Sequence, residues 1–287
     1  MRKLSFIHLI VLLCLSVFAF STHSTAQEKD GLLKVYFMDV GQGDAIFIET
    51  PNGNQVLIDG GPDNKVIQEL SKVMPFYDRD IDMIIASHPH ADHVAGLIEV
   101  LERYDVKNVL QAKEDYNSPV VPVWIEAVRN EGANEIEAIS GNVIDLGNGA
   151  TLTIIHPFIS VAGTLLKNPH DAVVVAILKY GALEVMLTGD MEAKVERRLM
   201  LEGYDLKSDI LKVGHHGSKT STTSEILSAV APEVAFIQVG AKNRYGHPSP
   251  EVLSRLEKFG IKYYRNDLDG TVKVVSDGQS YQIIRSN

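Results

Sequence analysis

Cysteine is almost absent from this sequence: its 287 residues include only one, Cys14. This residue lies inside an N-terminal apolar segment, so a chain that begins after that segment has no thiol. Disulfide bonds and cysteine-ligated metal sites are therefore excluded for the rest of the chain. An exported protein of this kind must be stabilised by its hydrophobic core, by a metal bound through other residues, or by both.

Long apolar runs are also scarce, and only residues 4–20 approach the length that spans a membrane. This run follows Arg2 and Lys3 and precedes a short stretch of small residues, "STA", a pattern typical of secretory signals. We therefore predict that residues 1–26 are a cleaved signal peptide. Residues 27–287 would form one exported domain, periplasmic or extracellular, without a stable membrane span. An uncleaved anchor at residues 4–20 is the alternative.

Positively charged residues are also scarce. The sequence has 27 lysines and arginines but 37 aspartates and glutamates, which gives a net charge of −10. Residues 1–26 carry two positive charges and no negative ones, so without them the net charge is −12. Such an acidic chain disfavours broad, sequence-independent binding to long DNA. It leaves room for a small phosphate-bearing substrate at a cationic metal centre. Nothing in the composition indicates an obligate protein partner.

Two familiar catalytic patterns are missing as well. The glycine-containing stretch "GQGDAIFIETPNG" has neither the dinucleotide fingerprint nor a phosphate-binding lysine, and Gly-x-Ser-x-Gly does not occur. We therefore expect neither a nucleotide-binding loop nor hydrolysis by a catalytic serine.

Strand and helix patterns alternate along the rest of the chain. Together they predict one α/β domain with two sheets and outer helices. The expected helices lie near 64–74, 94–104, 119–131, 191–202, 222–230 and 250–259. The expected strands lie at 32–59 (three strands), 81–87, 106–111, 151–156, 173–179, 183–188, 209–213, 233–239 and 261–264, with a final hairpin at 271–286.

The stretch "SHPHADHVAG", residues 87 to 96, contains three histidines and an aspartate within six positions. His88 and His90 are two residues apart at a strand end, so in an extended chain their side chains point the same way. Asp92 and His93 follow at an expected helix start. Imidazole and carboxylate ligands at such a site suit zinc, manganese or iron.

One segment cannot complete two coordination spheres, and further candidates stand beside other expected strands. Seven of the eight histidines after residue 26 fall in these motifs, a concentration that ordinary core histidines do not explain. The further candidates are His170, Asp190, His215, His216 and His247.

Several motifs together resemble a known family. "HPHADH" is similar to the HxHxDH signature of metallo-β-lactamase-fold hydrolases. "MDVGQGDAIFI", "LIDGG", "LTGD", "LKVGHHGS" and "YGHPSP" resemble the branch that holds the C-terminal hydrolase domain of ComEC competence proteins, with bacterial phosphorylcholine esterases as neighbours. The resemblance covers residues 32–275 and implies a four-layer αββα sandwich with two mixed sheets.

The resemblance also implies a ligand set for two divalent ions, zinc or manganese. Asp190 would bridge them, with Asp59 orienting a ligand histidine from behind. Because "NPHD" departs from the branch pattern, either His170 or Asp171 could be the third ligand of the first ion. The implied set is His88, His90 and His170 on the first ion and Asp92, His93 and His216 on the second.

Neighbouring side chains of an extended segment face opposite ways, so we expect His216 to point inward and His215 to contact substrate or support the ligands. His247 would assist the leaving group, or else be a structural loop residue. Lys212 and three other basic residues, Lys219, Lys242 and Arg244, flank these motifs and are expected to make the rim basic.

The resulting hypothesis is an exported two-metal phosphodiesterase that attacks with a metal-bridging hydroxide, with Asp92 and Asp190 essential to it. Its substrate would be a small phosphodiester or single-stranded nucleic acid. Hydrolysis of a carboxylic ester, lactone or β-lactam is the alternative within enzymes. A metal-binding scaffold without turnover is the alternative from another class.

Overall fold

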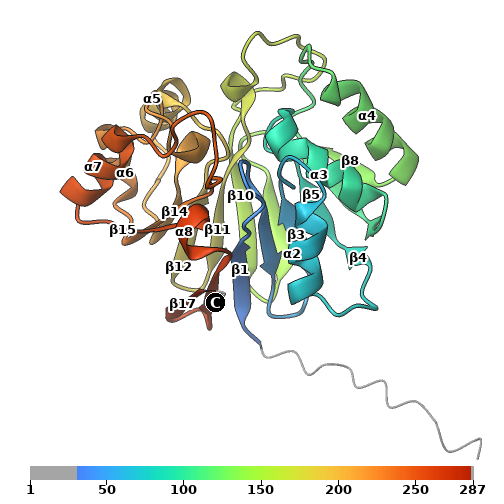
Figure 1. The fold of residues 1–287 in the computed structure, drawn as a ribbon, viewed down its shortest axis with the longest axis horizontal. Helices are drawn as coiled ribbons and strands as arrows, with labels where there is room; N and C mark the ends of the chain where they lie inside the picture. Colours follow the sequence, from blue (N-terminus) through green and yellow to red (C-terminus); the bar gives the residue numbers. More distant parts are fainter. Residues whose placement is uncertain (1–30, 286–287) are drawn as a thin grey trace, which may run out of the picture. The chain divides into compact units, whose positions relative to one another are not determined.

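The computed structural model describes residues 31–285, so the prediction of a signal peptide at residues 1–26 concerns a segment outside the described residues. Most strands of the described part belong to two large mixed sheets, which run through the middle of the molecule in Figure 1. The first sheet has eight strands in the order β17-β16-β1-β2-β3-β5-β7-β8. These are β1 (Leu33–Phe37), β2 (Ile46–Glu49), β3 (Gln55–Ile58), β5 (Met83–Ile85), β7 (Asn108–Gln111), β8 (Asn134–Glu137), β16 (Val272–Ser276) and β17 (Tyr281–Arg285).

The second sheet has seven strands in the order β15-β14-β13-β12-β11-β10-β9. Its strands from β9 to β12 pair antiparallel, and those from β12 to β15 pair parallel. A small third sheet pairs β4 (Asp80–Ile81) with β6 (Asp105–Val106). The strands of the second sheet are β9 (Val143–Gly147), β10 (Ala150–His156), β11 (Val175–Tyr180), β12 (Leu183–Leu187), β13 (Ile210–Lys212), β14 (Val234–Ile237) and β15 (Lys262–Arg265).

Helices cover the outer face of each sheet, and the labels of Figure 1 place them on opposite sides of the molecule. The first sheet carries α2 (Lys65–Val73), α3 (Ala91–Leu101) and α4 (Val120–Glu131); the second carries α5 (Ala193–Glu202), α6 (Ser224–Val230) and α7 (Pro250–Lys258). Three short helices sit in connections: η1 (Pro169–Ala172), η2 (Gly214–Gly217) and α8 (Asn266–Asp269).

Three buried clusters correspond to the three contacts between these layers. One lies between the sheets, where the rings of Phe37 and Phe236 stack with centroids 4.0 Å apart. The other two lie under the two sets of helices. Each inner sheet is thus buried on both faces, and burial of this apolar surface supplies the main driving force for folding. The predicted αββα sandwich is confirmed.

The differences from the predicted elements are local. Helix α3 begins at Ala91 rather than near residue 94, which places Asp92 and His93 in its first turn. Strands β8 and β9 were not predicted, because their half-exposed sequences "NEIE" and "VIDLG" lack a continuous apolar face. No helix within residues 31–285 combines the length and apolarity needed to cross a membrane.

Candidate metal centre

The candidate ligands gather where several strands end at one edge of the two sheets. The loop after β5 carries His88 and His90, the loop after β12 carries Asp190, and the turn after β13 carries His215 and His216. Strands β12 and β13 are parallel, so their carboxyl ends lie at the same edge. Segments far apart in the sequence therefore meet because of the topology, and the sequence-predicted residues are brought together.

The carboxylate of Asp190 is the hub of this cluster. Its Oδ2 atom lies 3.4 Å from His93 Nε2, 3.7 Å from His170 Nε2 and 3.9 Å from His88 Nε2. Two more ring nitrogens approach the same carboxylate: His215 Nε2 at 3.7 Å from Oδ2 and His216 Nε2 at 3.6 Å from Oδ1. Asp190 is only 1% exposed, so its charge is held away from bulk water.

Two groups of candidate ligands flank this hub. In the first, which we call the His88 side, His90 Nδ1 lies 3.0 Å from His88 Nε2 and 3.2 Å from His170 Nε2. In the second, the Asp92 side, Asp92 Oδ2 lies 3.4 Å from His216 Nε2, and His93 joins the pair from the same helix turn. Each group holds three donors close enough to share one ion, and Asp190 lies within reach of both.

Protein groups behind the histidines orient the Asp92 side. Asp59 accepts a hydrogen bond from His93 Nδ1 at 2.8 Å, and the backbone oxygen of Gln238 accepts one from His216 Nδ1 at 2.9 Å. These bonds leave both Nε2 atoms facing the centre, which is how outer carboxylates and carbonyls orient metal-ligating histidines. The contact of Asp59 with a candidate ligand agrees with its expected position; its effect on metal binding stays a prediction.

Two glycines make the Asp59 contact possible. Helix α3 packs so closely on the "LIDGG" turn that a Cβ atom at Gly96 would lie 1.8 Å from the backbone oxygen of Gly60. The backbone N–H of Gly60 donates to the oxygen of His93 at 2.8 Å, which joins the turn to the first turn of α3. The small residues thereby place the Asp59 carboxylate against His93.

Without ions, the two sides differ in the protonation of their histidines. Burial is the largest single influence and opposes a charge on His93 and His216, but the nearby carboxylates together outweigh it: Asp190 and Asp59 for His93, and Asp190 and Asp44 for His216. The pKa of His93 is raised well above its ordinary value, and that of His216 is raised to about 10. Burial, helped by neighbouring histidines, lowers the pKa of His88 and brings that of His90 to about 4.

The expected geometry of the "GHHG" segment was wrong. Instead of an extended strand it forms the tight turn η2, in which His215 (φ 46°, ψ 50°) and His216 (φ 52°, ψ 22°) are both left-handed. Both rings can therefore approach Asp190, although we expected only one to do so. His216 is buried with the Asp92 side, whereas His215 is half-buried and lines the mouth beside His247.

Lys212 was also misplaced by sequence reasoning. It does not lie on a basic rim but is fully buried under the centre, where its ammonium pairs with Asp44 and donates to the oxygen of Gly189 at 2.8 Å. Asp44 in turn lies 3.2 Å from His216 Nδ1. Lys219, Lys242 and Arg244 are exposed, as a rim requires.

Asp44 and Glu192 are two residues that the sequence argument missed. Glu192 Oε1 lies 3.2 Å from His215 Nδ1 and 3.8 Å from His170 Nδ1, and it accepts a hydrogen bond from the Thr220 hydroxyl at 2.8 Å. Its position two residues after Asp190 was the available signal. Asp44 stands inside the motif "DVGQGDA", which we used only to recognise the family.

The remaining predicted residues lie around the mouth. His247 is half-buried, and Tyr245 stacks on it with ring centroids 5.8 Å apart. Burial and the nearby His215 lower the pKa of His247, which opposes the protonated form that donates a proton to a leaving group. Asp171 pairs with Lys194 at 2.7 Å, whereas His170 faces the centre. This geometry favours His170 over Asp171 as the third ligand.

The donor set suits divalent cations. Three side-chain atoms at the centre, His93 Nε2, His216 Nε2 and Asp190 Oδ1, are buried and have no hydrogen-bond partner among residues 31–285. Unpaired buried polar atoms are costly, and bound cations would satisfy them. Nitrogen and carboxylate donors of this kind fit zinc, manganese or iron.

Comparison with known proteins agrees with this geometry. Residues 38–240 match the family model described as the metallo-beta-lactamase superfamily. The chain is 30% identical to the ComE operon protein 3 of Bacillus subtilis over 84% of its length, and 31% identical to the Recombination protein 2 of Haemophilus influenzae over 92%. It spans about a third of each of these curated relatives, 32% and 31%.

A solved structure shows the same fold. Igni18, a metallo hydrolase from Ignicoccus hospitalis, superimposes with a TM-score of 0.53 at 16% identity, covering 84% of this chain and 98% of that one. The similarity to the ComE operon protein 3 and to the Recombination protein 2 supports the ComEC-like branch recognised in the sequence. With a family match over most of its length, this fold and this set of candidate ligands, the chain belongs to the metallo-beta-lactamase superfamily.

Proposed function

We propose that the protein is a two-metal hydrolase that cleaves phosphodiesters. The observation that carries the proposal is the Asp190 carboxylate, which has five imidazole nitrogens within 3.9 Å and one group of candidate ligands on each side. His88, His90 and His170 would hold one ion, and Asp92, His93 and His216 the other. Bound divalent ions would lower the pKa of water toward 7 and polarise the substrate oxygens.

The residues of the chain prepare this centre in three ways. Asp59 and the Gln238 carbonyl fix which nitrogen of His93 and His216 faces inward. The buried Lys212 ammonium balances the charge of Asp44 close to Asp190. At the mouth, His215 and His247 line the cavity above Asp190 and can exchange protons with a leaving group.

The choice of a phosphodiester rests on two supporting observations. One of the relatives named above is a recombination protein by its name, and nucleic acid is a phosphodiester polymer. In addition, the mouth loop that bears His247 also bears the exposed Lys242 and Arg244, which would attract an anionic substrate. We propose a small phosphodiester or single-stranded nucleic acid as substrate.

The test follows hydrolysis of bis(p-nitrophenyl) phosphate by protein that begins at residue 27, loaded in turn with zinc and manganese. Single-stranded DNA, a β-lactam and p-nitrophenylphosphorylcholine serve as parallel substrates, and Asp190→Asn is the control. We expect metal-dependent phosphodiester turnover that the variant loses. Turnover of the β-lactam alone would replace the proposal with the carboxylic alternative, and about two bound ions without any turnover would favour a scaffold.

We further propose that the protein acts outside the cytoplasm after removal of residues 1–26. Expression of the full chain in its host, followed by mass spectrometry of the exported fraction, tests this. A mature amino terminus at Gln27 is expected; a chain retained in the membrane fraction with residues 4–20 intact would support the anchor instead.

A further inference from the structure

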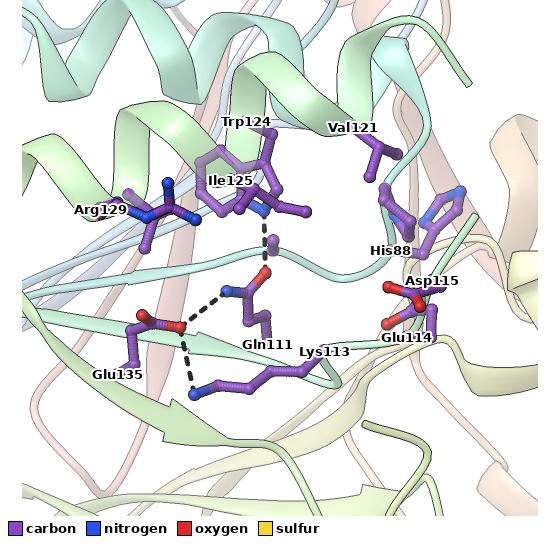
Figure 2. A pocket seen from close by; sticks show the side chains of 13 residues that line it. His88, Gln111, Lys113, Glu114, Asp115, Val121, Trp124, Ile125, Arg129 and Glu135 are labelled. Carbon is purple, nitrogen blue, oxygen red and sulfur yellow. Dashed lines mark hydrogen bonds and ion pairs between the residues drawn. The ribbon is translucent and has the colours of Figure 1, made fainter. Parts of the chain in front are cut away.

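A second cavity lies beside the metal centre, between α4 and strands β7 and β8 (Figure 2). We call it the α4 pocket. Its volume of about 190 Å³ is several times the ~30 Å³ that one water molecule occupies in the liquid. Of the candidate ligands it touches only His88, and none of the residues at the mouth of the metal centre line it. It is therefore a separate site, and its ligand is independent of the proposed hydrolysis.

One wall of the α4 pocket is apolar. Trp124 and Ile125 on α4 face the cavity in Figure 2, with Val121 further along the helix toward His88. Trp124 is 2% exposed, and its indole Nε1 donates to Gln111 Oε1 at 2.8 Å. The indole N–H is thus already paired, so the ring contributes an apolar surface to a ligand. Apolar walls with a few placed polar groups are typical of small-molecule sites.

Three polar side chains on the floor of the pocket are paired with one another. Lys113 Nζ lies 3.1 Å from Glu135 Oε2, and Gln111 Nε2 lies 3.5 Å from the same oxygen. Figure 2 shows these contacts as a connected chain beneath Trp124. Since these groups satisfy one another, they do not call for a ligand.

Glu114, at the His88 end of the pocket, is different. Its side chain is buried, with the residue 8% exposed, and its Oε1 atom has no hydrogen-bond partner in the part of the chain that the structure describes. Burial raises the pKa of this carboxyl to about 7. A buried acceptor without a partner is costly to the folded protein, so the position calls for a donor that the described part of the chain does not supply.

From this geometry we propose that the α4 pocket binds a small primary ammonium compound with an apolar body. The ammonium would donate a hydrogen bond to Glu114, and the body would lie against Trp124 and Ile125. A charge-assisted N–H···O bond at a buried carboxylate is stronger than a neutral one. A quaternary ammonium ion has the charge but no N–H, and should bind less well.

The experiment uses the tryptophan of the pocket as its own reporter, because Trp124 is the only tryptophan in the chain. Phenethylamine is titrated into the full-length, zinc-loaded protein while tryptophan emission is followed. Two probes with the same phenyl body are run beside it: 3-phenylpropionate, which is anionic, and N,N,N-trimethylphenethylammonium, which lacks an N–H. We expect a saturable change with phenethylamine and at least tenfold weaker binding of the other two.

Two variants assign the contact to one carboxyl. Glu114→Gln should weaken phenethylamine at least tenfold, while Asp115→Asn, at the adjacent carboxyl that also lines the pocket but is exposed to water, should weaken it much less. Equal far-UV circular dichroism of both variants checks that they are folded. The proposal is overturned by the absence of a saturable signal, by equal binding of the three probes, or by equal effects of the two variants.

Discussion

The two sides of the candidate centre contain similar residues but are held differently. On the Asp92 side, His93 and His216 each have an oxygen behind Nδ1, at 2.8 Å and 2.9 Å. On the His88 side, His88 Nδ1 has only the Ser87 hydroxyl behind it, at 3.0 Å, His90 turns its Nδ1 toward its neighbours, and the Glu192 carboxylate is 3.8 Å from His170 Nδ1. The histidines of the Asp92 side are therefore anchored more firmly, which shows that similar ligands need not form similar ion sites. We expect the Asp92 side to be better organised before its ion binds.

The carboxylate shared by both sides should give the largest effect. Asp190→Asn removes the negative charge that all five ring nitrogens approach. We expect activity to fall by at least about a thousandfold, with metal content below two ions per chain. Turnover assays and elemental analysis after dialysis measure both. A variant that keeps full turnover would refute the proposal that two ions bridged by Asp190 carry out the reaction.

The pH dependence of metal affinity should separate the two sides. In the metal-free protein the pKa values of His93 and His216 are both raised, that of His216 to about 10. Both rings are therefore protonated at neutral pH. An ion on the Asp92 side must displace these protons, so its affinity should rise with pH by up to about tenfold per unit for each proton released.

The His88 side should behave differently between pH 6 and 9. The pKa values of His88 and His90 are lowered, the latter to about 4, so these rings are already neutral in that range. The affinity for the ion on this side should therefore depend on pH less steeply than the affinity on the Asp92 side. Zinc titrations against a chelating dye at several pH values would resolve the two constants. Equal pH dependence of the two zinc affinities would contradict the expected difference between the two sides.

The hydrogen bond behind His93 is a more local test. Asp59→Asn keeps the shape of the side chain but removes its charge, and it should lower affinity for the ion on the Asp92 side by about 10- to 100-fold. The constant for the His88 side should stay the same. Because Asp59 also helps to raise the pKa of His93, the pH slope of the weakened site should become shallower. An equal loss on both sides would mean that Asp59 acts on the fold rather than on His93.

The sequence predicts the layered fold well because its signals are local. Apolar strands and amphipathic helices mark most elements to within a few residues, and motifs at strand ends mark the ligands. The half-exposed β8 and β9 have weaker patterns and escaped prediction. The family resemblance, and not periodicity, supplied the grouping of ligands into two sets.

What the sequence does not predict depends on contacts between distant segments. The burial of Lys212 against Asp44 arises where the turn before β2 meets the end of β13, and a lysine in a short apolar stretch carries no mark of such a partner. The left-handed turn at His215 and His216 is equally hidden, since positive φ is uncommon for any residue except glycine, even for histidine, which adopts it more often than most. Both features required the packed structure.

The smallest expected effect concerns the weaker anchor of the His88 side. Glu192→Gln keeps an oxygen that can accept from His215 or Thr220 but loses the charge near His170. We expect affinity for the ion on the His88 side to fall less than tenfold, with the other constant unchanged.

Asp171→Asn is the matched control, because Asp171 pairs with Lys194 rather than facing the centre. It should change neither constant. Asp171→Asn could instead weaken the affinity for the ion on the His88 side more than Glu192→Gln does. Asp171 would then replace His170 as the third ligand, because only a group in contact with the ion should matter more than the carboxylate behind it.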